Sequence, residues 1–111
     1  MVWNIDLFES PRKEKPVGVF IKSLEKNTRA KVAYSVNLLR EYGPNLAMPY
    51  SKFIGSKLYE LRIRGREDVR IFYSFLDNKI YLLHGFKKKT QKTPQKEIRL
   101  TLERLKILTK S

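Results

Sequence analysis

Arginine and lysine side chains recur in the middle of the chain at a spacing that suits the binding of an anion. They are Arg62, Arg64, Arg70, Lys87, Lys88 and Lys89. A guanidinium presents a rigid fork of N–H donors that matches phosphate oxygens, and a lysine adds a compact positive charge. This pattern favours a phosphate-containing ligand lying across the structure. The alternative is that these are ordinary basic residues on the solvent-facing side of a sheet.

Three further residues are candidates on chemical grounds. Glu60 precedes Arg62 by two residues and could act as a base, but neutralising Arg62 is its more ordinary role. His84 lies in an otherwise apolar run, where a hydrogen-bonded core histidine is the usual expectation, and Phe86 could stack on a base. A single histidine excludes any mechanism with two imidazoles, and the absence of cysteine excludes disulfides and thiolate zinc sites. We find no cluster of metal ligands and expect no cofactor.

Three apolar-rich runs must position these side chains. Residues 58–63, 69–76 and 80–86 are rich in β-branched and aromatic residues, and turn-forming residues separate them at 65–68 and 77–79. They predict a three-stranded antiparallel meander. Alternation along the strands predicts that one face of the first strand carries Leu58, Glu60, Arg62 and Arg64. In the second strand it groups Arg70 with Phe72 and Ser74, and sends Tyr73 to the opposite face.

The segments before the meander predict a strand and a helical hairpin. Residues 2–8 alternate as a short strand. A helix beginning at Pro16 has apolar residues at one-face spacing up to Leu24. A second helix is expected over 29–42, with Thr28 offering an N-cap and Gly43 ending it.

The segments after this hairpin are a connector and a final helix. Residues 45–56 contain Pro and Gly and are expected to form a long loop. The last helix is expected to begin at Pro94, with Thr93 as its N-cap, and to end near Thr109. Its apolar stripe is expected to pack on the rest of the chain. Residues 1–111 are therefore expected to form one α+β domain.

The charge of the chain is the strongest feature of its composition. The formal net charge is +13 and the isoelectric point is near 10.1. Such a surface favours nucleic acid as the partner over an anionic membrane or an acidic protein. No apolar run approaches the roughly 20 residues that span a bilayer, and residues 1–6 lack the pattern of a signal peptide. We therefore expect a cytoplasmic protein that does not bind membranes.

Three sequence blocks resemble a known family of toxins. They are LYELR at 58–62, VRIFY at 69–73 and LHGFKKKTQKTP at 83–94. Together with the order of the predicted elements, they are similar to the RelE/ParE toxin superfamily, and most closely to its phage-derived HigB-like branch. The resemblance covers nearly the whole chain. It implies a RelE-like fold made of an N-terminal strand, a helical hairpin, a three-stranded meander and a C-terminal helix.

The resemblance also implies a function. Proteins of this type are toxins of type II toxin–antitoxin systems, in which an mRNA interferase cuts mRNA, usually on the ribosome. A helix-turn-helix (HigA-like) antitoxin holds the toxin inactive. ParE-like members of the superfamily instead act on DNA gyrase. A third reading is a basic nucleic-acid-binding module without catalytic activity.

Metal-free RNA cleavage defines the roles that the basic residues would take. The ribose 2′-OH attacks the adjacent phosphate, which requires a proton acceptor, a proton donor for the departing 5′-oxygen, and cations for the developing negative charge. Arg62, Arg70 and Lys88 are the candidate catalytic residues. Candidates for RNA binding are Arg64, Phe86, Lys87 and Lys89, and further candidates for the site are Glu60 and His84.

Overall fold

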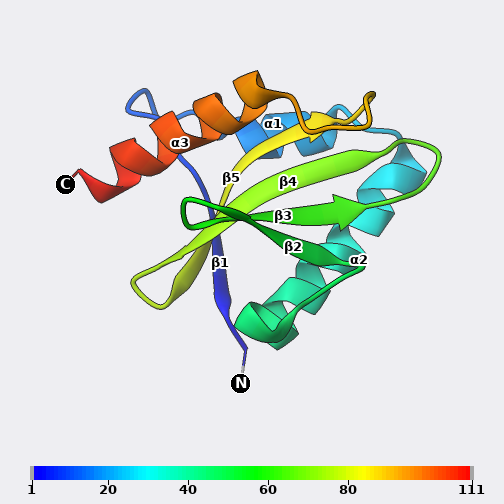
Figure 1. Cartoon of the computed structure of the whole chain (residues 1–111), viewed down its shortest axis with the longest axis horizontal. Coiled ribbons are helices and arrows are strands. Elements are labelled where there is room, and N and C mark those ends of the chain that lie inside the picture. Colours follow the sequence, from blue (N-terminus) through cyan, green and yellow to red (C-terminus); the bar gives the residue numbers. More distant parts are fainter. Residues whose placement is uncertain (1, 111) are drawn as a thin grey trace.

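The computed structural model describes residues 2–110, which form one mixed β-sheet with α-helices packed on it (Figure 1). The elements in chain order are β1 (Asn4–Leu7), α1 (Pro16–Lys22), α2 (Lys26–Tyr42), the 3₁₀ turn η1 (Gly43–Asn45), β2 (Ser51–Gly55), β3 (Leu58–Ile63), β4 (Val69–Leu76), β5 (Lys79–Lys87) and α3 (Gln95–Thr109). The strand order is β1-β5-β4-β3-β2, with β1 parallel to β5 and the other pairs antiparallel. The expected α+β class is confirmed, and the architecture is compatible with a RelE-like fold.

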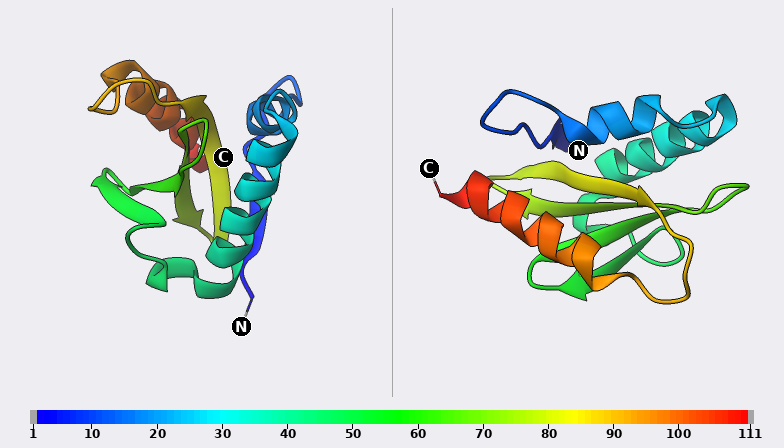
Figure 2. Two further views of the ribbon diagram at one scale, coloured as in Figure 1. Left: turned by 90° about the vertical axis from the view of Figure 1, so that its right-hand side faces the viewer. Right: turned by 90° about the horizontal axis from the view of Figure 1, so that it is seen from above.

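The sheet lies between two helical layers. Helices α1 and α2 cover one face and α3 packs on the other face (Figure 2). Burial of apolar side chains is the main force that holds such layers together. The larger core, between the α1–α2 hairpin and the sheet, contains Val17, Leu24, Val32, Leu39, Leu61, Ile63, Val69, Ile71, Tyr73, Ile80 and Leu82. The smaller core beneath α3 contains Phe8, Leu58 and Leu83, with Ile98, Leu102, Leu105 and Leu108 of α3 packed against it. The expected packing of the last helix on its own domain is confirmed.

The predicted meander is confirmed, with one irregularity that re-aims β5. Tyr73 of β4 pairs with Leu82, whereas Phe72 pairs with His84, so Leu83 is an extra residue in β5. A β-bulge of this kind reverses the face on which the following residues lie. It places His84 and Phe86 on the α3 face together with Arg70, whereas Gly85 between them faces α1.

The expectation of a long loop over residues 45–56 is wrong in its second half. Residues 51–55 form β2, which pairs with β3 at the edge of the sheet. The alternation of apolar and polar residues that marks a strand is weak here, because an edge strand buries few side chains. Both Lys52 and Phe53 of β2 are exposed.

Two predicted N-caps are also wrong. Thr28 lies inside α2, which begins at Lys26, and its hydroxyl donates to Glu67 Oε1 at 2.9 Å. Thr93 precedes α3, but its hydroxyl donates to Glu60 Oε2 at 3.1 Å and not to the helix. In both cases a carboxylate from a distant segment lies within reach, and a charged acceptor makes a stronger hydrogen bond than a backbone group.

Two glycines are required by the close approach of aromatic rings. A Cβ atom at Gly85 of β5 would lie 2.5 Å from the ring of Phe20, which packs from α1 onto the sheet. At Gly43, where φ is +50°, a Cβ atom would lie 2.3 Å from the indole of Trp3. The predicted end of α2 at Gly43 is therefore confirmed, and the absence of a side chain there also makes room for Trp3. Within residues 2–110, no helix is both long enough and apolar enough to cross a membrane.

Candidate phosphate-binding cleft

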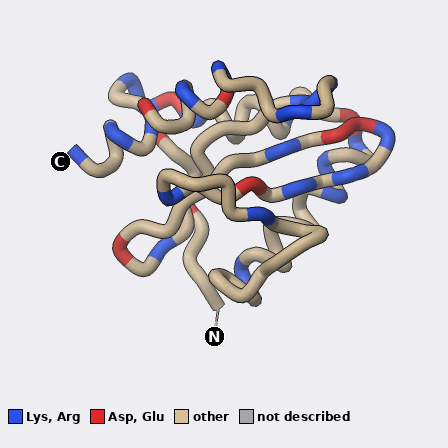
Figure 3. The backbone as a smooth tube through the Cα atoms, viewed as in Figure 1, with Lys and Arg blue, Asp and Glu red and all other residues tan. Residues whose placement is uncertain are grey.

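A polar cleft of about 700 Å³ opens at the end of the sheet where β3 ends and β4 begins. We call it the basic cleft. Its lining residues are Arg62, Arg64, Asp68, Arg70, Lys88, Lys89, Thr90 and Gln91. Five of these are cationic and one is acidic. Figure 3 shows Lys and Arg residues gathered along β3, β4 and the segment that follows β5 at this end of the molecule. The cleft is therefore suited to an anionic ligand.

Three segments that are separate in the sequence build this cleft. The antiparallel register places Arg62 of β3 directly opposite Arg70 of β4. The backbone N–H of Lys88 donates to the carbonyl of Asp68 at 2.7 Å, which ties the segment after β5 to the start of β4. Sequence reasoning proposed Arg62, Arg64, Arg70, Lys88 and Lys89 as site residues, and the structure brings all five together.

Glu60 lies beside both arginines. Its Oε1 atom is 3.5 Å from Nε of Arg70 and 3.8 Å from Nε of Arg62, and its residue is 3% exposed. Its Oε2 atom accepts the hydrogen bond from the Thr93 hydroxyl. The carboxylate is thus held in place and largely shielded from the cleft. This arrangement supports neutralisation of the arginines as its role and leaves little of it available as a base.

The two arginines differ in how far they are enclosed. The side chain of Arg70 is 2% exposed and donates through Nη1 to Asp68 Oδ1, whereas Arg62 is 13% exposed and its Nη1 donates to the Met48 sulfur at 3.3 Å. Nε of each arginine is buried and has no hydrogen-bond acceptor among the described residues. Burying a charge is costly unless an opposite charge is near. The attraction of Glu60 therefore offsets the burial of both guanidinium groups.

Three residues that line the cleft, Asp68, Thr90 and Gln91, are not among the residues that the sequence predicted, and Asp68 is the charged one. The sequence predicts a turn for Asp68, because the residue lies in the run Gly65 to Asp68 between two strands. Its side chain is 43% exposed and its carboxylate pairs with Arg70 at the edge of the cleft. The signal that could have identified it is its spacing, because residues two apart at the start of a strand lie on one face. Among the lining residues of the cleft, Asp68 is the only acid.

Two proposed RNA-binding residues do not line the cleft. Nζ of Lys87 lies 2.5 Å from Glu67 Oε2, and this hydrogen bond and that from Thr28 lower the pKa of the Glu67 carboxyl. Phe86 is 6% exposed and packs against the rings of Phe72 and His84, with centroids 5.4 and 5.6 Å apart. Lys87 is therefore engaged in an ion pair, and the ring of Phe86 is enclosed in an aromatic cluster.

His84 is a hydrogen-bonded residue of the interface between β5 and α3. Its Nε2 atom lies 2.8 Å from Glu97 Oε1, and its Nδ1 atom accepts from Arg104 Nη1 at 3.3 Å. Desolvation lowers the pKa of the imidazole, which favours the neutral form of the ring. The usual expectation for this residue, a satisfied core histidine, is confirmed.

Tyr73 faces the main core, on the side of the sheet away from Arg70. Its Oη atom lies 2.5 Å from Ser51 Oγ, and its ring is 1% exposed. Burial raises the pKa of the phenol to about 12. The predicted separation of Tyr73 and Arg70 onto opposite faces is confirmed. Within residues 2–110, no group of three or more His, Asp or Glu side chains is arranged to hold a metal ion.

The protein is an α+β domain with a mixed five-stranded sheet and a cleft at one end that is lined mainly by cationic residues. The chain belongs to the family described as phage-derived protein Gp49-like (DUF891), whose model matches residues 19–106. This family consists of RelE/toxin-like proteins. The matched region includes every residue that lines the basic cleft. No curated protein matches this chain.

Proposed function

We propose that the protein is the toxin of a type II toxin–antitoxin system and that it acts as an mRNA interferase of the HigB-like branch. The observation that carries the proposal is the convergence of Arg62, Arg70 and Lys88, from three separate segments, on one basic cleft. Membership of a family of RelE/toxin-like proteins supports the toxin assignment. Its protein partner would be a helix-turn-helix antitoxin, and its substrate would be mRNA bound on the ribosome.

Residues of the cleft can be assigned to each step of metal-free RNA cleavage. The ribose 2′-oxygen forms a bond to phosphorus as the bond from phosphorus to the 5′-oxygen breaks, leaving a 2′,3′-cyclic phosphate and a 5′-hydroxyl. Arg62 and Arg70 stabilise the negative charge that develops on the phosphate oxygens. Lys88 gives a proton to the departing 5′-oxygen. Arg64 and Lys89 bind neighbouring phosphates.

Asp68 is the carboxylate that we assign as acceptor of the 2′-OH proton. Of the two acids near the arginines, the Asp68 side chain is 43% exposed whereas that of Glu60 is 4% exposed. Only Asp68 lines the cleft. A general base must come within hydrogen-bonding distance of the proton that it removes, and of these two acids Asp68 is the one whose side chain is open to the cleft.

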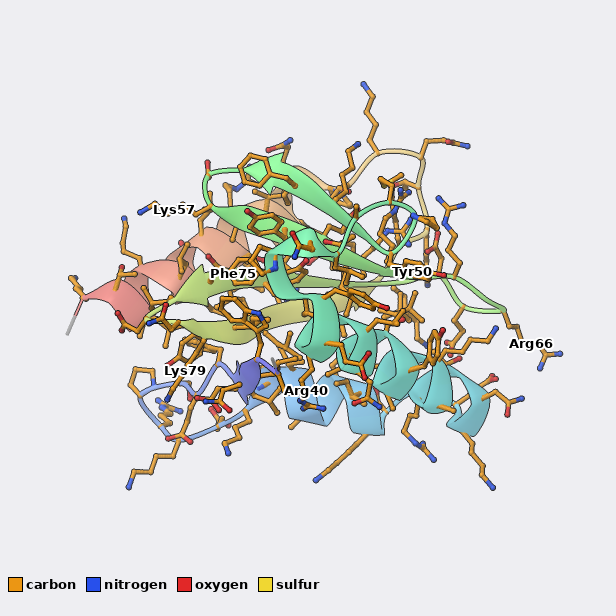
Figure 4. The ribbon with its side chains drawn as sticks, turned by 90° about the horizontal axis from the view of Figure 1, so that it is seen from below. Arg40, Tyr50, Lys57, Arg66, Phe75 and Lys79 are labelled. Atoms are coloured by element: carbon orange, nitrogen blue, oxygen red, sulfur yellow. The ribbon has the colours of Figure 1, made fainter. Side chains whose placement is uncertain are left out.

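Cleavage of a reporter mRNA on translating ribosomes, mapped by primer extension, tests the proposal. We expect Lys88→Ala and Asp68→Asn to slow cleavage by roughly 10²- to 10⁴-fold, the usual contribution of a general acid or base. Arg66→Ala is the matched control. It removes a cation from the same β3–β4 loop, at a residue that points away from the body of the protein (Figure 4), and should change the rate only a few-fold.

Three outcomes would overturn the assignment. Undiminished cleavage in both Lys88→Ala and Asp68→Asn would refute the roles of these residues. Inhibition of DNA supercoiling without mRNA cuts would identify a gyrase inhibitor. Salt-sensitive RNA binding without any product would leave a non-catalytic binding module.

Expression in a bacterial host tests the toxin assignment separately. Induction of the native chain should arrest growth, and Arg62→Ala, which removes a guanidinium from the cleft, should relieve the arrest. Co-expression of a helix-turn-helix protein from the neighbouring reading frame should also restore growth. Arrest that persists in Arg62→Ala at equal protein levels would count against the basic cleft as the toxic site.

A further inference from the structure

A second hollow of about 230 Å³ adjoins the basic cleft, between α2 and the segment that leads into β2. We call it the tyrosine pocket. Its lining residues are Lys31, Tyr34, Ser35, Pro49, Tyr50, Arg62, Ile63 and Arg64. Arg62 and Arg64 also line the basic cleft, so the two hollows share a wall. A ligand held by these two arginines could therefore extend from one hollow into the other.

The backbone fixes the position of Tyr50 relative to Arg62. The N–H of Arg62 donates to the carbonyl of Tyr50 at 2.9 Å, and the N–H of Tyr50 donates to the carbonyl of Ala47 at 3.0 Å. Figure 4 shows Tyr50 in this segment, close to α2. Tyr34 comes from α2 itself. Both tyrosines of the pocket are thus anchored to the framework that also carries the arginines.

Both tyrosine rings present open surface. Tyr34 is 60% exposed and Tyr50 is 42% exposed, and in the described part of the chain neither ring packs against another aromatic ring. The pocket is smaller than the roughly 300–1,000 Å³ of pockets that hold drug-sized ligands. Its size and its aromatic walls suit one planar ring system.

We propose that the tyrosine pocket binds a nucleobase of the RNA strand whose phosphates lie in the basic cleft. The inference rests on RNA being the ligand of the proposed function, but it does not require cleavage. Single-stranded RNA is held by cationic side chains along its backbone and by aromatic rings on which its bases stack. The arginines shared by the two hollows provide the first element, and Tyr34 and Tyr50 provide the second.

A minimal fluorescent nucleotide tests this arrangement. The probe is the 3′,5′-bisphosphate of the 2-aminopurine ribonucleoside. It has one base and two phosphates, so it cannot bind in several registers as a longer strand could. Its fluorescence should be quenched on binding, because stacking quenches 2-aminopurine. The abasic ribose bisphosphate, measured by competition, reports the contribution of the phosphates alone.

We expect Tyr34→Ala and Tyr50→Ala each to weaken binding of the nucleotide by roughly 5- to 150-fold, which corresponds to the loss of one base–aromatic stack. Binding of the abasic competitor should stay unchanged in both variants. Tyr34→Phe and Tyr50→Phe retain the aromatic ring and should bind as the native chain does. Tyr42→Ala is the matched control, because Tyr42 is 51% exposed on the same helix and lines neither hollow.

Equal affinity of the native chain for the nucleotide and for its abasic form would overturn the proposal. Unchanged affinity for the nucleotide in both alanine variants would also overturn it. Failure of the proposed cleavage has a different signature, because the nucleotide would then bind as expected while the mRNA remained uncut. Normal mRNA cleavage with no contribution of the base to binding would refute the tyrosine pocket and leave the interferase proposal in place.

Discussion

Replacement of Glu60 by Gln tests whether this carboxylate holds the basic cleft together. The substitution keeps the shape of the side chain and removes its charge. It takes this counter-charge from the buried guanidinium of Arg70 and the partly buried one of Arg62, whose Nε atoms lie 3.5 and 3.8 Å from the altered group. Breaking a buried ion pair by removing one partner costs about 3–5 kcal/mol. Both distances exceed that of a direct hydrogen bond and Arg70 keeps its ion pair with Asp68, so we expect the lower half of this range.

The expected loss is a large share of the free energy of unfolding, which is about 5–15 kcal/mol for a typical domain. A change of 1 kcal/mol shifts the Tm of a domain of this size by about 4 °C, so Tm should fall by about 12–16 °C. Urea unfolding followed by circular dichroism measures the free energy, and calorimetry measures Tm. Glu103→Gln on the exposed face of α3 is the matched control, because it removes the same charge from a residue without an ion pair among the described residues. It should change the free energy by no more than about 0.5 kcal/mol.

A double-mutant cycle separates the ion pair from other effects of the substitution. If Glu60 and Arg70 stabilise one another, Glu60→Gln combined with Arg70→Gln should cost at least about 1 kcal/mol less than the sum of the two single changes. An unchanged Tm in Glu60→Gln together with complete loss of RNA cleavage would refute this reasoning. That result would identify Glu60 as a base in the reaction and not as a structural counter-charge.

Three further predictions concern the core. Burial raises the pKa of the Tyr73 phenol from its ordinary 10.0 to about 12, so its stabilising contribution is present below pH 10 and is lost as the pH rises towards 12. The free energy of unfolding, measured with urea, should therefore fall by about 3 kcal/mol across that window in the native chain, and this fall should be absent in Tyr73→Phe. Desolvation lowers the pKa of His84 below 6.5, so the unfolded chain binds the proton more readily and stability falls as the pH drops below 6.5. In His84→Gln the free energy of unfolding should depend less on pH in this acidic range, as the same measurement would show. Gly85→Ala should destabilise the fold by about 1–3 kcal/mol through its clash with Phe20, and Phe20→Ala in the same chain should relieve that clash, as a thermal double-mutant cycle would reveal.

The relation between Arg62 and Arg70 illustrates how far the sequence could lead. Alternation along each strand correctly grouped Arg62 with Glu60, and separated Arg70 from Tyr73. It could not pair the strands, because the register across a turn depends on the turn and on packing. Only the structure places Arg62 directly opposite Arg70. The same limit applied to β5, where the bulge that turns His84 and Phe86 towards α3 leaves no local signal.

The sequence alone determined the strands of the meander, the three helices and the basic character of the chain, because alternation, helical spacing and charge are properties of neighbouring residues. Tertiary structure decided which charges meet. Lys87 and Lys88 are adjacent in the sequence, yet Lys87 pairs with Glu67 whereas Lys88 lines the cleft with Asp68. The cleft forms where segments that are distant in the sequence come together, and such contacts cannot be predicted from the pattern of neighbouring residues.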